Sequence, residues 1–474
     1  MIFVDTRFLA VCAALFVVGR LPPSRLLRGA VLVAANVVVL HLMVGNVLAL
    51  WPVLALAAMG YASLFFIRQS RGVAMASIAV VIAFFLYVKR YPPFDALPTG
   101  PAAIMATVGL SYVLFRTLHI MIDFKDGSLA ERPSIATTFN YNFLFLSFLS
   151  GPIQRLEGFA GSSFLDRRVS ISIEDFGRQA ARVVTGLFKI LVLSGVFEYF
   201  FRTALSDIPT AADHGARAWW IAAAIVAFVA YLYANFSGYM DVVVAIGRLL
   251  GFDLPENFDR PFSAANIQEF WQRWHITLSL WIRIYLFGPL QRYMVERTAT
   301  KAAAANASLA CTFIAFFVIG AWHSPSLSGL VYGTLLGLGA LAHQRYRTWL
   351  ATRLGRQGLR ALDGELWYRS AARALTLTHF FASVVCLWPD QAMVAILLHN
   401  LPTLDIAGGL ALIFVAIFVL GIVAAAAAAV MAGIPRWPPA YLARTSLATA
   451  QIIILVFSTF VVDAPVPGFV YGGF

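Results

Sequence analysis

The stretch Thr312-Phe-Ile-Ala-Phe-Phe-Val-Ile-Gly-Ala-Trp-His323-Ser-Pro325 closes an apolar run with a histidine and a proline. The whole run covers residues 302–322, which at about 1.5 Å per residue is enough for a helix to cross the ~30 Å core of a bilayer. An ionisable side chain at such depth usually faces a cavity, a partner or a reaction, because burying its charge in lipid is costly. The stretch therefore predicts a membrane-spanning helix with a functional residue, His323, at its end.

The residues that follow predict where His323 lies. The next apolar run, residues 327–342, would cover only about 24 Å of the ~30 Å core, and Pro325 disfavours helical backbone at Ser324. We therefore expect a turn at residues 324–326 that is recessed below the membrane surface, with His323 at a helix end inside the membrane. A neutral histidine bonded to a backbone carbonyl would explain the same pattern without any function.

The composition of the 474 residues is that of a membrane protein. Hydrophobic residues make up 60% of the chain and charged residues 12%, whereas soluble domains carry roughly 25% charged residues. The formal net charge of +12 comes from Lys and Arg in short loops between apolar runs, as expected of cytoplasmic loops. Because these cations are not interleaved with aromatic residues on one surface, we expect no nucleic-acid partner.

Apolar runs follow one another along the chain and predict an all-α polytopic membrane protein with about a dozen spans. The first run is interpreted as a retained span and not as a cleaved signal peptide, and residues 1–474 are expected to form a single integral membrane domain. The Arg-rich segment 345–360 is expected to be a cytoplasmic loop. The runs lie near residues 8–19, 29–45, 48–67, 72–88, 101–122, 183–204, 217–236, 302–322, 327–343, 372–388, 405–432 and 444–462.

Two regions, residues 133–182 and 252–292, lack the pattern of simple spans and predict re-entrant or interfacial helices. In the second region, apolar residues recur at helical spacing: Ile267, Phe270, Trp271, Trp274 and Leu278. Polar residues recur on another face: Gln268, Gln272, His275 and Ser279. This pattern predicts one amphipathic helix with His275 on its polar face. Such a basic, Trp-rich helix could instead simply lie on the membrane surface.

The other reactive residues give weaker signals. Three cysteines lie in apolar runs without disulfide or metal-ligand spacing and are interpreted as small buried hydrophobes: Cys12, Cys311 and Cys386. Four histidines lie near span ends, where their polar tips can reach the headgroups: His41, His119, His343 and His399. His214 lies in a polar loop, and His379 lies inside an apolar run and could line the interior. No metal site is expected, because nothing supplies further ligands to His275 and His323.

Four sequence blocks together carry a family resemblance. They are Gly109-Leu-Ser-Tyr-Val-Leu-Phe-Arg116, Ser150-Gly-Pro-Ile-Gln-Arg155, a long block that runs from Phe236-Ser-Gly-Tyr-Met-Asp241 through residues 249–261 to Phe270-Trp-Gln-Arg-Trp-His275-Ile-Thr-Leu-Ser-Leu-Trp281, and Gly320-Ala-Trp-His323. Through these blocks, within residues 109–325, the chain resembles the membrane-bound O-acyltransferase family. It looks like a member of the bacterial branch that includes alginate O-acetylation proteins and the teichoic acid D-alanyl transfer protein. The closing residues 468–474 resemble the aromatic tail of that branch.

The resemblance implies a protein of about 11 transmembrane helices, with re-entrant or interfacial helices around a central tunnel, in the bacterial cytoplasmic (inner) membrane. It implies that His323 is the family's catalytic histidine and that His275 is the second polar residue of the active site. It also implies an acyl thioester donor, on coenzyme A or an acyl carrier protein, that enters from the cytoplasm. The acceptor hydroxyl would enter from the opposite face, and no cofactor would be tightly bound.

The chain departs from the branch at two places. Ser324 follows the histidine where the branch commonly has glycine. Arg283-Ile284 stands where the alginate-type pattern has an Arg-Asp pair followed by a Pro-Leu-Gly-Gly turn. Both departures bear on recognition of the acceptor more than on the chemistry.

Acyl transfer requires a hydroxyl that loses its proton as it attacks the thioester carbonyl. Histidine suits this step because its ordinary pKa lies near working pH and burial favours the neutral base. We predict that His323 is the general base and that His275 orients the acceptor or polarises the carbonyl. Trp274 and Trp322 would shape the tunnel and exclude water. The further predicted substrate-binding residues are Asn257, Arg273 and Ser279.

The predicted acceptor is a hydroxyl of an extracytoplasmic cell-envelope polysaccharide or polymer, and the predicted acyl group is acetyl or similarly small. A periplasmic transferase could complete the transfer as a partner. Two other functions remain open. The acceptor could be a lipid or a small hydroxylated metabolite. Alternatively the protein could be a proton-coupled transporter or flippase in which His275 and His323 relay protons.

Overall fold

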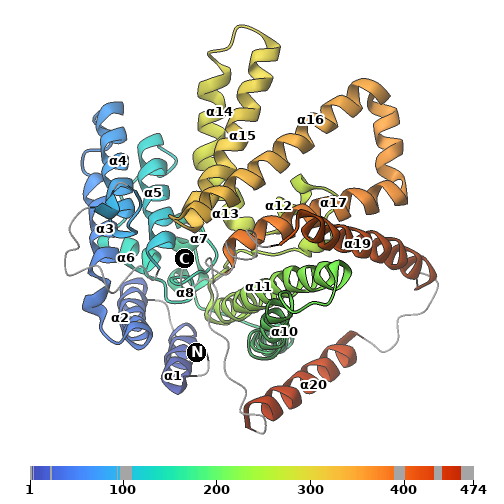
Figure 1. Ribbon diagram of the computed structural model, residues 1–474. Helices are drawn as coiled ribbons and strands as arrows, with labels where there is room; N and C mark the ends of the chain where they lie inside the picture. Colours follow the sequence, from blue (N-terminus) through green and yellow to red (C-terminus); the bar gives the residue numbers. More distant parts are fainter. Residues whose placement is uncertain are drawn as a thin grey trace. The chain divides into compact units, whose positions relative to one another are not determined.

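In the computed structural model, the described residues are 3, 5–21, 24–92, 94–96, 109–388, 401–431 and 440–460. Apart from one isolated β-bridge, the regular structure within these ranges is helical (Figure 1), which confirms the predicted all-α class. Seven of the described helices are both long and apolar enough to cross a membrane, as a multi-pass membrane protein requires. The total number of spans stays a prediction. The seven are Arg25–Val44, Arg71–Val88, Ile173–Asp207, His214–Leu250, Lys301–His323, Leu366–Leu387 and Thr403–Ala428.

The chain packs as two compact units. The first comprises residues 1–190, 236–256 and 450–474, and the second comprises residues 191–235 and 257–449. The long helix α11 (His214–Leu250) contributes its first part to the second unit and its last part to the first. The prediction of a single domain over residues 1–474 stays a prediction.

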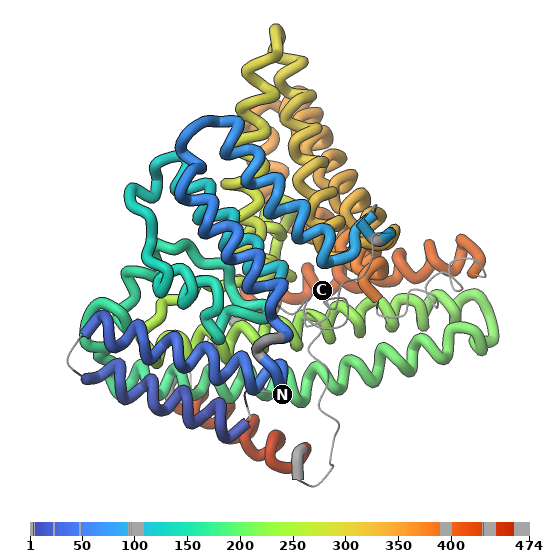
Figure 2. The backbone as a smooth tube through the Cα atoms, turned by 90° about the vertical axis from the view of Figure 1, so that its left-hand side faces the viewer, coloured from blue at the N-terminus to red at the C-terminus, as the bar shows by residue number. Residues whose placement is uncertain are grey.

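Four helices of the first unit begin at serine caps. Ser24, Ser70, Ser134 and Ser172 each accept a hydrogen bond from a backbone N–H in the first turn of the helix they begin, which satisfies a donor that the helix itself cannot. Figure 2 shows α1 and α2, in dark blue, running side by side. The helices are α1 (Thr6–Val18), α2 (Arg25–Val44), η2 (Val47–Leu50), α3 (Trp51–Ser63), α4 (Arg71–Val88), η3 (Phe94–Ala96), α5 (Leu110–Asp126), α6 (Ile135–Asn142), α7 (Leu156–Ala160), α8 (Ser163–Asp166) and α9 (Ile173–Phe188).

Buried arginines support the irregular backbone of the first unit. Of the predicted irregular region 133–182, residues 133–172 contain short helices and loops, so many carbonyls lack helical partners, whereas residues 173–182 already belong to the long helix that begins at Ile173. Arg116 is fully buried and donates to the carbonyls of Asn142, at 2.8 Å, and Ser147. Arg28, also buried, donates to the carbonyls of Gly19, Leu21, Phe164 and Arg167. Protein groups thus replace the water that a broken backbone would otherwise need.

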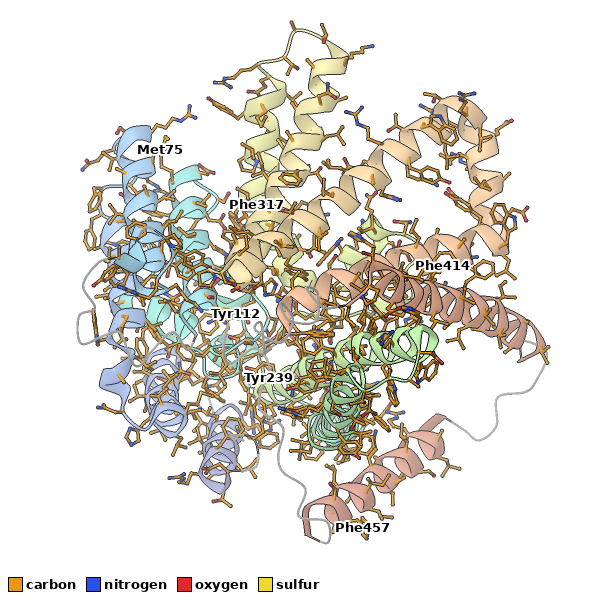
Figure 3. All side chains as sticks on the ribbon, in the orientation of Figure 1. Met75, Tyr112, Tyr239, Phe317, Phe414 and Phe457 are labelled. Atoms are coloured by element: carbon orange, nitrogen blue, oxygen red, sulfur yellow. The ribbon has the colours of Figure 1, made fainter. Side chains whose placement is uncertain are left out.

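In the first unit, the burial of His119 differs from its prediction. His119, which we expected near the headgroups, is only 2% exposed, and its Nε2 lies 3.2 Å from an Asp123 carboxylate oxygen. The Tyr141 ring packs against His119 with 5.9 Å between centroids, the Leu156 amide donates to its Nε2 at 3.4 Å, and Arg155 pairs with the same carboxylate at 2.9 Å. Figure 3 shows Tyr112 and Tyr239 among packed side chains, whereas Met75 on α4 points outward, as expected of a helix that faces lipid.

The second unit contains the helices that position the predicted site. The 3-10 helix η6 and the helices α12 and α13 are short and lie in the region, residues 252–292, for which re-entrant or interfacial helices were predicted. Figure 1 shows α14 and α15 side by side. The elements are η5 (Lys189–Leu193, a π-helical continuation of α9), α10 (Ser194–Asp207), η6 (Pro261–Ser263), α12 (Ile267–Arg273), α13 (Ile276–Ile282), the π-helix η7 (Arg283–Phe287), α14 (Gly288–Val295), α15 (Lys301–His323), α16 (Leu327–Gly364), α17 (Leu366–Val384), η8 (Val385–Leu387), α19 (Thr403–Met431) and the first part of α20 (Ala440–Phe460).

Helices α15 and α16 pack through glycines. A Cβ atom on Gly320 would lie 2.2 Å from the backbone nitrogen of Gly333, and one on Gly333 would lie 2.7 Å from the carbonyl oxygen of Phe317. Such distances leave room for glycine alone, as in the small-residue contacts of membrane helices. This close approach holds the end of α15, with His323, against the first turns of α16.

Two predictions about α16 are wrong. The helix does not end near residue 343 but continues to Gly364, with a break at Gly355, whose φ of 65° lies in the left-handed region. Residues 345–360 are therefore mostly helical and do not form a loop. The prediction ended the helix at the first polar residues, but Arg, Leu and Ala are good helix formers, so the helix continues. The recessed turn was inferred from a short return helix, and that premise fails. Ser324 does leave the helix, with φ −149° and ψ 136°.

Some predictions fall partly or wholly outside the described residues. These include the aromatic tail 468–474, His399 and the beginning of the predicted span 101–122. Of the three cysteines, Cys311 is buried, whereas Cys12 and Cys386 are partly exposed.

Candidate active site

The predicted continuous helix through His275 is wrong. Helix α12 ends at Arg273, and Trp274 is extended, with φ −108° and ψ 126°. His275 has φ 46° and ψ 52°, and α13 begins at the next residue. Left-handed backbone at a residue other than glycine is uncommon and costs of order 1–3 kcal/mol, so the surroundings must enforce it. His275 thus occupies a sharp corner between two short helices.

A neighbouring segment enforces this corner. Residues 257–259 run antiparallel to residues 273–276: the Asp259 amide donates to the Arg273 carbonyl and the Ile276 amide to the Asn257 carbonyl, both at 3.0 Å. The side-chain oxygen of Asn257, which is fully buried, accepts from the Thr277 amide at 3.0 Å and the Thr277 hydroxyl at 2.7 Å. Asn257 therefore caps α13 from a distant part of the sequence, and this fixes the backbone of His275.

Trp274 lies in an aromatic cluster. Its ring stacks on Phe270 with 5.7 Å between centroids and 15° between planes, and it meets Phe258 and Phe380 edge-on at 5.1 and 5.0 Å. Such contacts contribute about 0.5–1.5 kcal/mol each beyond burial. The cluster holds the segment before His275 rigidly.

His323 is the last residue of α15. Its imidazole is 6% exposed, with its centroid 4.7 Å from the Trp322 ring and 5.6 Å from the Tyr332 ring, which stands edge-on. Tyr332 comes from α16, and the glycine contact between α15 and α16 brings it there. Two aromatic rings therefore flank the histidine and limit the access of water.

The two histidines influence one another. His275 is 2% exposed. Burial lowers the pKa of His275, and positive charge on His323 would lower it further, so the two imidazoles lie within electrostatic range of one another. The α12–α13 corner and the end of α15 thus each place one of the two predicted catalytic residues in the second unit. A neutral imidazole can both donate and accept a hydrogen bond.

Arg273 and Ser279 have partners within their own region. The Arg273 guanidinium pairs with Glu269 at 2.7 Å and lies 3.9 Å from Asp259. The Ser279 hydroxyl donates to the Trp274 carbonyl at 3.5 Å. The charge of Arg273 is therefore neutralised by acidic side chains of its own region. Ser279 lines a cavity.

Two cavities lie within the second unit. One, of about 690 Å³, is formed by α12, α13, η7, α15 and α16 and includes Ser279. Its lining also includes Ile276, which directly follows His275, and Ile319, one helical turn before His323, although neither histidine lines it. The other, of about 900 Å³, is formed mainly by α16 and α17, and its lining includes His379. Ile267 and His343 line both. The predicted central tunnel stays a prediction.

Among the described residues, no group of three or more His, Cys, Asp or Glu side chains could hold a metal ion. Sequence reasoning missed Tyr332, Thr277 and the glycine contact. The contact had a visible signal, since Gly329, Gly333 and Gly337 recur every four residues. Thr277 had none, because its partner Asn257 lies far away in the sequence.

Known proteins give a consistent assignment. Residues 108–359 match the family described as MBOAT, membrane-bound O-acyltransferase. The chain is 26% identical over 292 residues to a teichoic acid D-alanyltransferase of Bacillus subtilis (strain 168), covering 60% of this chain and 70% of that protein. It is 28% identical over 239 residues to a probable alginate O-acetylase AlgI of Pseudomonas fluorescens, covering 50% of this chain and 44% of that protein. The chain thus spans less than half the length of this alginate relative.

Both relatives carry names that denote acyl transfer, which agrees with the predicted enzyme class. The matched region covers more than half of the chain and contains all seven predicted site residues. The chain therefore belongs to the membrane-bound O-acyltransferase family.

Proposed function

We propose that this protein transfers an acetyl or similarly small acyl group from a thioester donor to a hydroxyl of a cell-envelope polysaccharide or polymer. The observation that carries the proposal is the pair of buried histidines, His275 and His323, within the region that matches the family. The names of the relatives, an alginate O-acetylase and a teichoic acid D-alanyltransferase, support a polymeric acceptor.

In the proposed reaction His323 is the general base. The acceptor hydroxyl gives its proton to His323 as its oxygen forms a bond to the thioester carbonyl carbon. The carbon–sulfur bond then breaks, and the thiolate leaves with the proton that His323 held. No covalent acyl-enzyme is formed, and His323 returns to its neutral state, so the step balances without a cofactor.

His275 is proposed to stabilise the negative charge that develops on the carbonyl oxygen. A neutral imidazole can donate one hydrogen bond to that oxygen, and a donor held in place beforehand contributes more than one that must reorient. The left-handed backbone of His275 and the cap from Asn257 supply such preorganisation. Asn257 would then act through the position of His275, without touching the substrate.

The surrounding side chains have narrower proposed roles. Trp322 flanks His323 and would exclude water from the thioester, while Trp274 would hold the wall of the site. Ser279 would contact substrate from its cavity. Arg273 would bind substrate only if its pairing with Glu269 opened.

The proposed location is the bacterial cytoplasmic membrane. The donor, on coenzyme A or a carrier protein, would approach from the cytoplasm, and the polymer from the opposite face. A periplasmic transferase that completes the modification is a proposed partner.

The test compares wild type with the His323→Ala variant, and His41→Ala, an exposed histidine at the end of α2, serves as the matched control. Purified protein receives acetyl-coenzyme A or an acetylated carrier protein, with or without envelope polysaccharide. We expect polysaccharide-dependent loss of thioester in wild type and His41→Ala, and at least a hundredfold less in a folded His323→Ala variant, because general-base catalysis contributes about 10²–10⁴-fold. Equal turnover in all three would exclude His323 as the base.

A further inference from the structure

Three membrane-spanning helices of the chain have ends that are joined to one another in the first unit. Helix α2 begins there, the long helix that starts as α9 begins there, and α11 ends there. The Val169 amide, just before α9, donates to the Gly19 carbonyl at 2.9 Å. The Phe164 amide donates to the Gly251 carbonyl, just after α11, at 3.1 Å. The three helix ends therefore lie at one face of the membrane.

A buried arginine fixes the loop between α8 and α9 at this face. Arg28, in the first turn of α2, donates to the carbonyl of Phe164 at 2.9 Å and to that of Arg167 at 2.6 Å. Helix α8 also packs against α2 (Figure 1). Because the backbone of the loop is held from two sides, the side chains that it presents keep a defined position.

Three exposed arginines, which we call the arginine patch, stand at this face: Arg25, Arg167 and Arg168. Arg25 donates to the Ala160 carbonyl at 3.2 Å, and Nε of Arg167 donates to the Ser163 hydroxyl oxygen at 3.1 Å. Each guanidinium carries five N–H donors, so these single contacts leave most of them available. The patch thus offers several charge-assisted donors at neighbouring points of one surface.

Nearby acidic side chains offset little of this charge. Asp166 is the one acidic residue from the start of α8 to the start of α9. It lies 3.7 Å from Arg25 with both side chains more than half exposed, and such pairs contribute little. In the first turn of α9, Glu174 and Asp175 both pair with Arg178. The arginine patch therefore keeps a net positive charge.

Two protruding apolar side chains flank the arginine patch, at the starts of α2 and α9. Leu26 is 86% exposed and Ile173 is 87% exposed, the highest values of any large apolar side chain among the described residues. Such exposure to water is unfavourable. A cation beside a protruding apolar side chain instead suits the boundary of a bilayer, where the charge meets headgroups and the apolar side chain meets acyl chains.

We propose that the arginine patch binds the headgroup phosphate of an anionic phospholipid in the cytoplasmic leaflet. Phosphate oxygens accept paired hydrogen bonds from guanidinium groups, and the acyl chains of the same lipid cover Leu26 and Ile173. The positive-inside rule places these helix ends on the cytoplasmic side, where the negative surface of the membrane attracts basic segments. This inference goes beyond the proposed acyl transfer and uses none of its steps.

Other anionic ligands would use this surface less fully. An acidic protein would neutralise the arginine patch but would leave Leu26 and Ile173, at the starts of two spans, to the lipid. A free phosphate ester would contact the arginines alone. A phospholipid contacts both kinds of group, so binding with and without acyl chains distinguishes these ligands.

The test measures lipid binding to the purified full-length protein in detergent by native mass spectrometry. The probes are dioleoyl phosphatidylglycerol, dioleoyl phosphatidylcholine and sn-glycerol 3-phosphate. Wild type should bind phosphatidylglycerol about tenfold or more tightly than either other probe, because each arginine near an anionic surface contributes roughly fivefold in affinity. Arg25→Gln/Arg168→Gln should weaken phosphatidylglycerol by about tenfold or more and leave phosphatidylcholine unchanged.

Two further variants separate charge from apolar contact. Arg71→Gln removes an exposed arginine that also begins a span, α4, outside the arginine patch, and it should bind both lipids as wild type does. Leu26→Ser/Ile173→Ser should weaken both lipids by the same factor, because contacts with acyl chains do not depend on the headgroup. Melting temperatures near the wild-type value show that the variants are folded.

Equal binding of phosphatidylglycerol by wild type and Arg25→Gln/Arg168→Gln would overturn the proposed site. An equal loss in Arg71→Gln would reduce the effect to general attraction between positive charge and anionic lipid, and would also overturn it. Binding of sn-glycerol 3-phosphate as tight as that of phosphatidylglycerol would make the ligand a free phosphate ester. The absence of any preference between the two lipids in wild type would exclude an anionic lipid and leave an acidic protein as the occupant.

Discussion

His275 depends on residues that do not touch its ring in the contacts described above. Its left-handed backbone is unfavourable by itself, and the pairing with residues 257–259 compensates for that cost. Asn257 is the centre of this arrangement, since its carbonyl and its side chain both accept hydrogen bonds from the start of α13. Strain that is held by neighbouring backbone is typical of sites where one side chain must keep one direction.

We predict that Asn257→Ala reduces both stability and activity. The substitution leaves the Thr277 amide and hydroxyl without their acceptor in a fully buried place, and each unsatisfied buried group costs about 1–3 kcal/mol. We expect a loss of at least 1 kcal/mol in the free energy of unfolding, measured by denaturant titration in detergent, and a lower kcat. Asn306→Ala, which removes a side chain bonded to Arg345 at an exposed site, should change stability by less than about 0.5 kcal/mol. Equal stability of both variants would contradict the capping role.

The histidine corner also predicts a response to acid. The pKa of His275 is lowered from 6.5 to about 3, chiefly by burial. The unfolded chain therefore binds a proton below pH 6.5 that the folded chain rejects, so stability is complete above pH 6.5 and falls as the pH decreases. We expect the melting temperature of His275→Asn to fall less than that of wild type between pH 7.5 and 5. Asparagine tolerates left-handed backbone, so the corner should persist. A parallel fall in both proteins would count against a neutral buried His275.

At the scale of elements, the contact between α15 and α16 decides where His323 lies. Gly333→Ala would place a Cβ atom 2.7 Å from the Phe317 carbonyl oxygen, so the helices must separate. Overpacking of this kind costs about 1–3 kcal/mol, and we expect a lower melting temperature and a kcat reduced by tenfold or more, because the shift moves His323 relative to His275.

The matched change is Gly364→Ala at the end of the same helix, where an added Cβ meets nothing within 4 Å. It should leave melting temperature and kcat near the wild-type values. Normal activity in Gly333→Ala would show that the position of His323 does not depend on this contact.

The elements differ in how far the sequence predicts them. The end of α15 at His323 is a local matter, because Pro325 excludes helix at Ser324, and it was predicted. The corner at His275 could not be predicted from nearby residues, because the helical spacing of apolar residues continues from Ile267 to Leu278 across the break. The corner depends on hydrogen bonds from Asn257, which become visible only in the folded structure. The length of α16 was not predicted, because its apolar run ends near residue 343 whereas the helix continues to Gly364.

At the scale of the whole molecule, the membrane character was predictable and the reaction partners were not. Composition and apolar runs suffice to predict the membrane character, because a helix that crosses the bilayer must be apolar over about 20 residues. The identity of donor and acceptor depends on cavities that residues far apart in sequence create, such as Ile267 with His343. The family match covers residues 108–359, which include the α12–α13 corner and the end of α15.

The last prediction concerns which way α16 crosses the membrane. From Leu327 to its break at Gly355 the helix rises about 42 Å, more than the ~30 Å hydrocarbon core, although α16 is not among the seven helices that combine length with apolarity. Exposed arginines follow at its far end, at positions 353, 356 and 360. The positive-inside rule places that end in the cytoplasm, and it places the turn before Leu327, next to His323, outside.

Single cysteines in a variant that lacks Cys12, Cys311 and Cys386 test this orientation. Both chosen positions, Ser326 and Gln357, are exposed. In spheroplasts, a membrane-impermeant maleimide should label Ser326→Cys and leave Gln357→Cys unlabelled, and inverted vesicles should give the opposite result. Labelling of both from one side would mean that α16 does not span the membrane, so donor and acceptor would meet His323 from the same face. The reverse pattern would invert the protein and place the turn next to His323 on the cytoplasmic side.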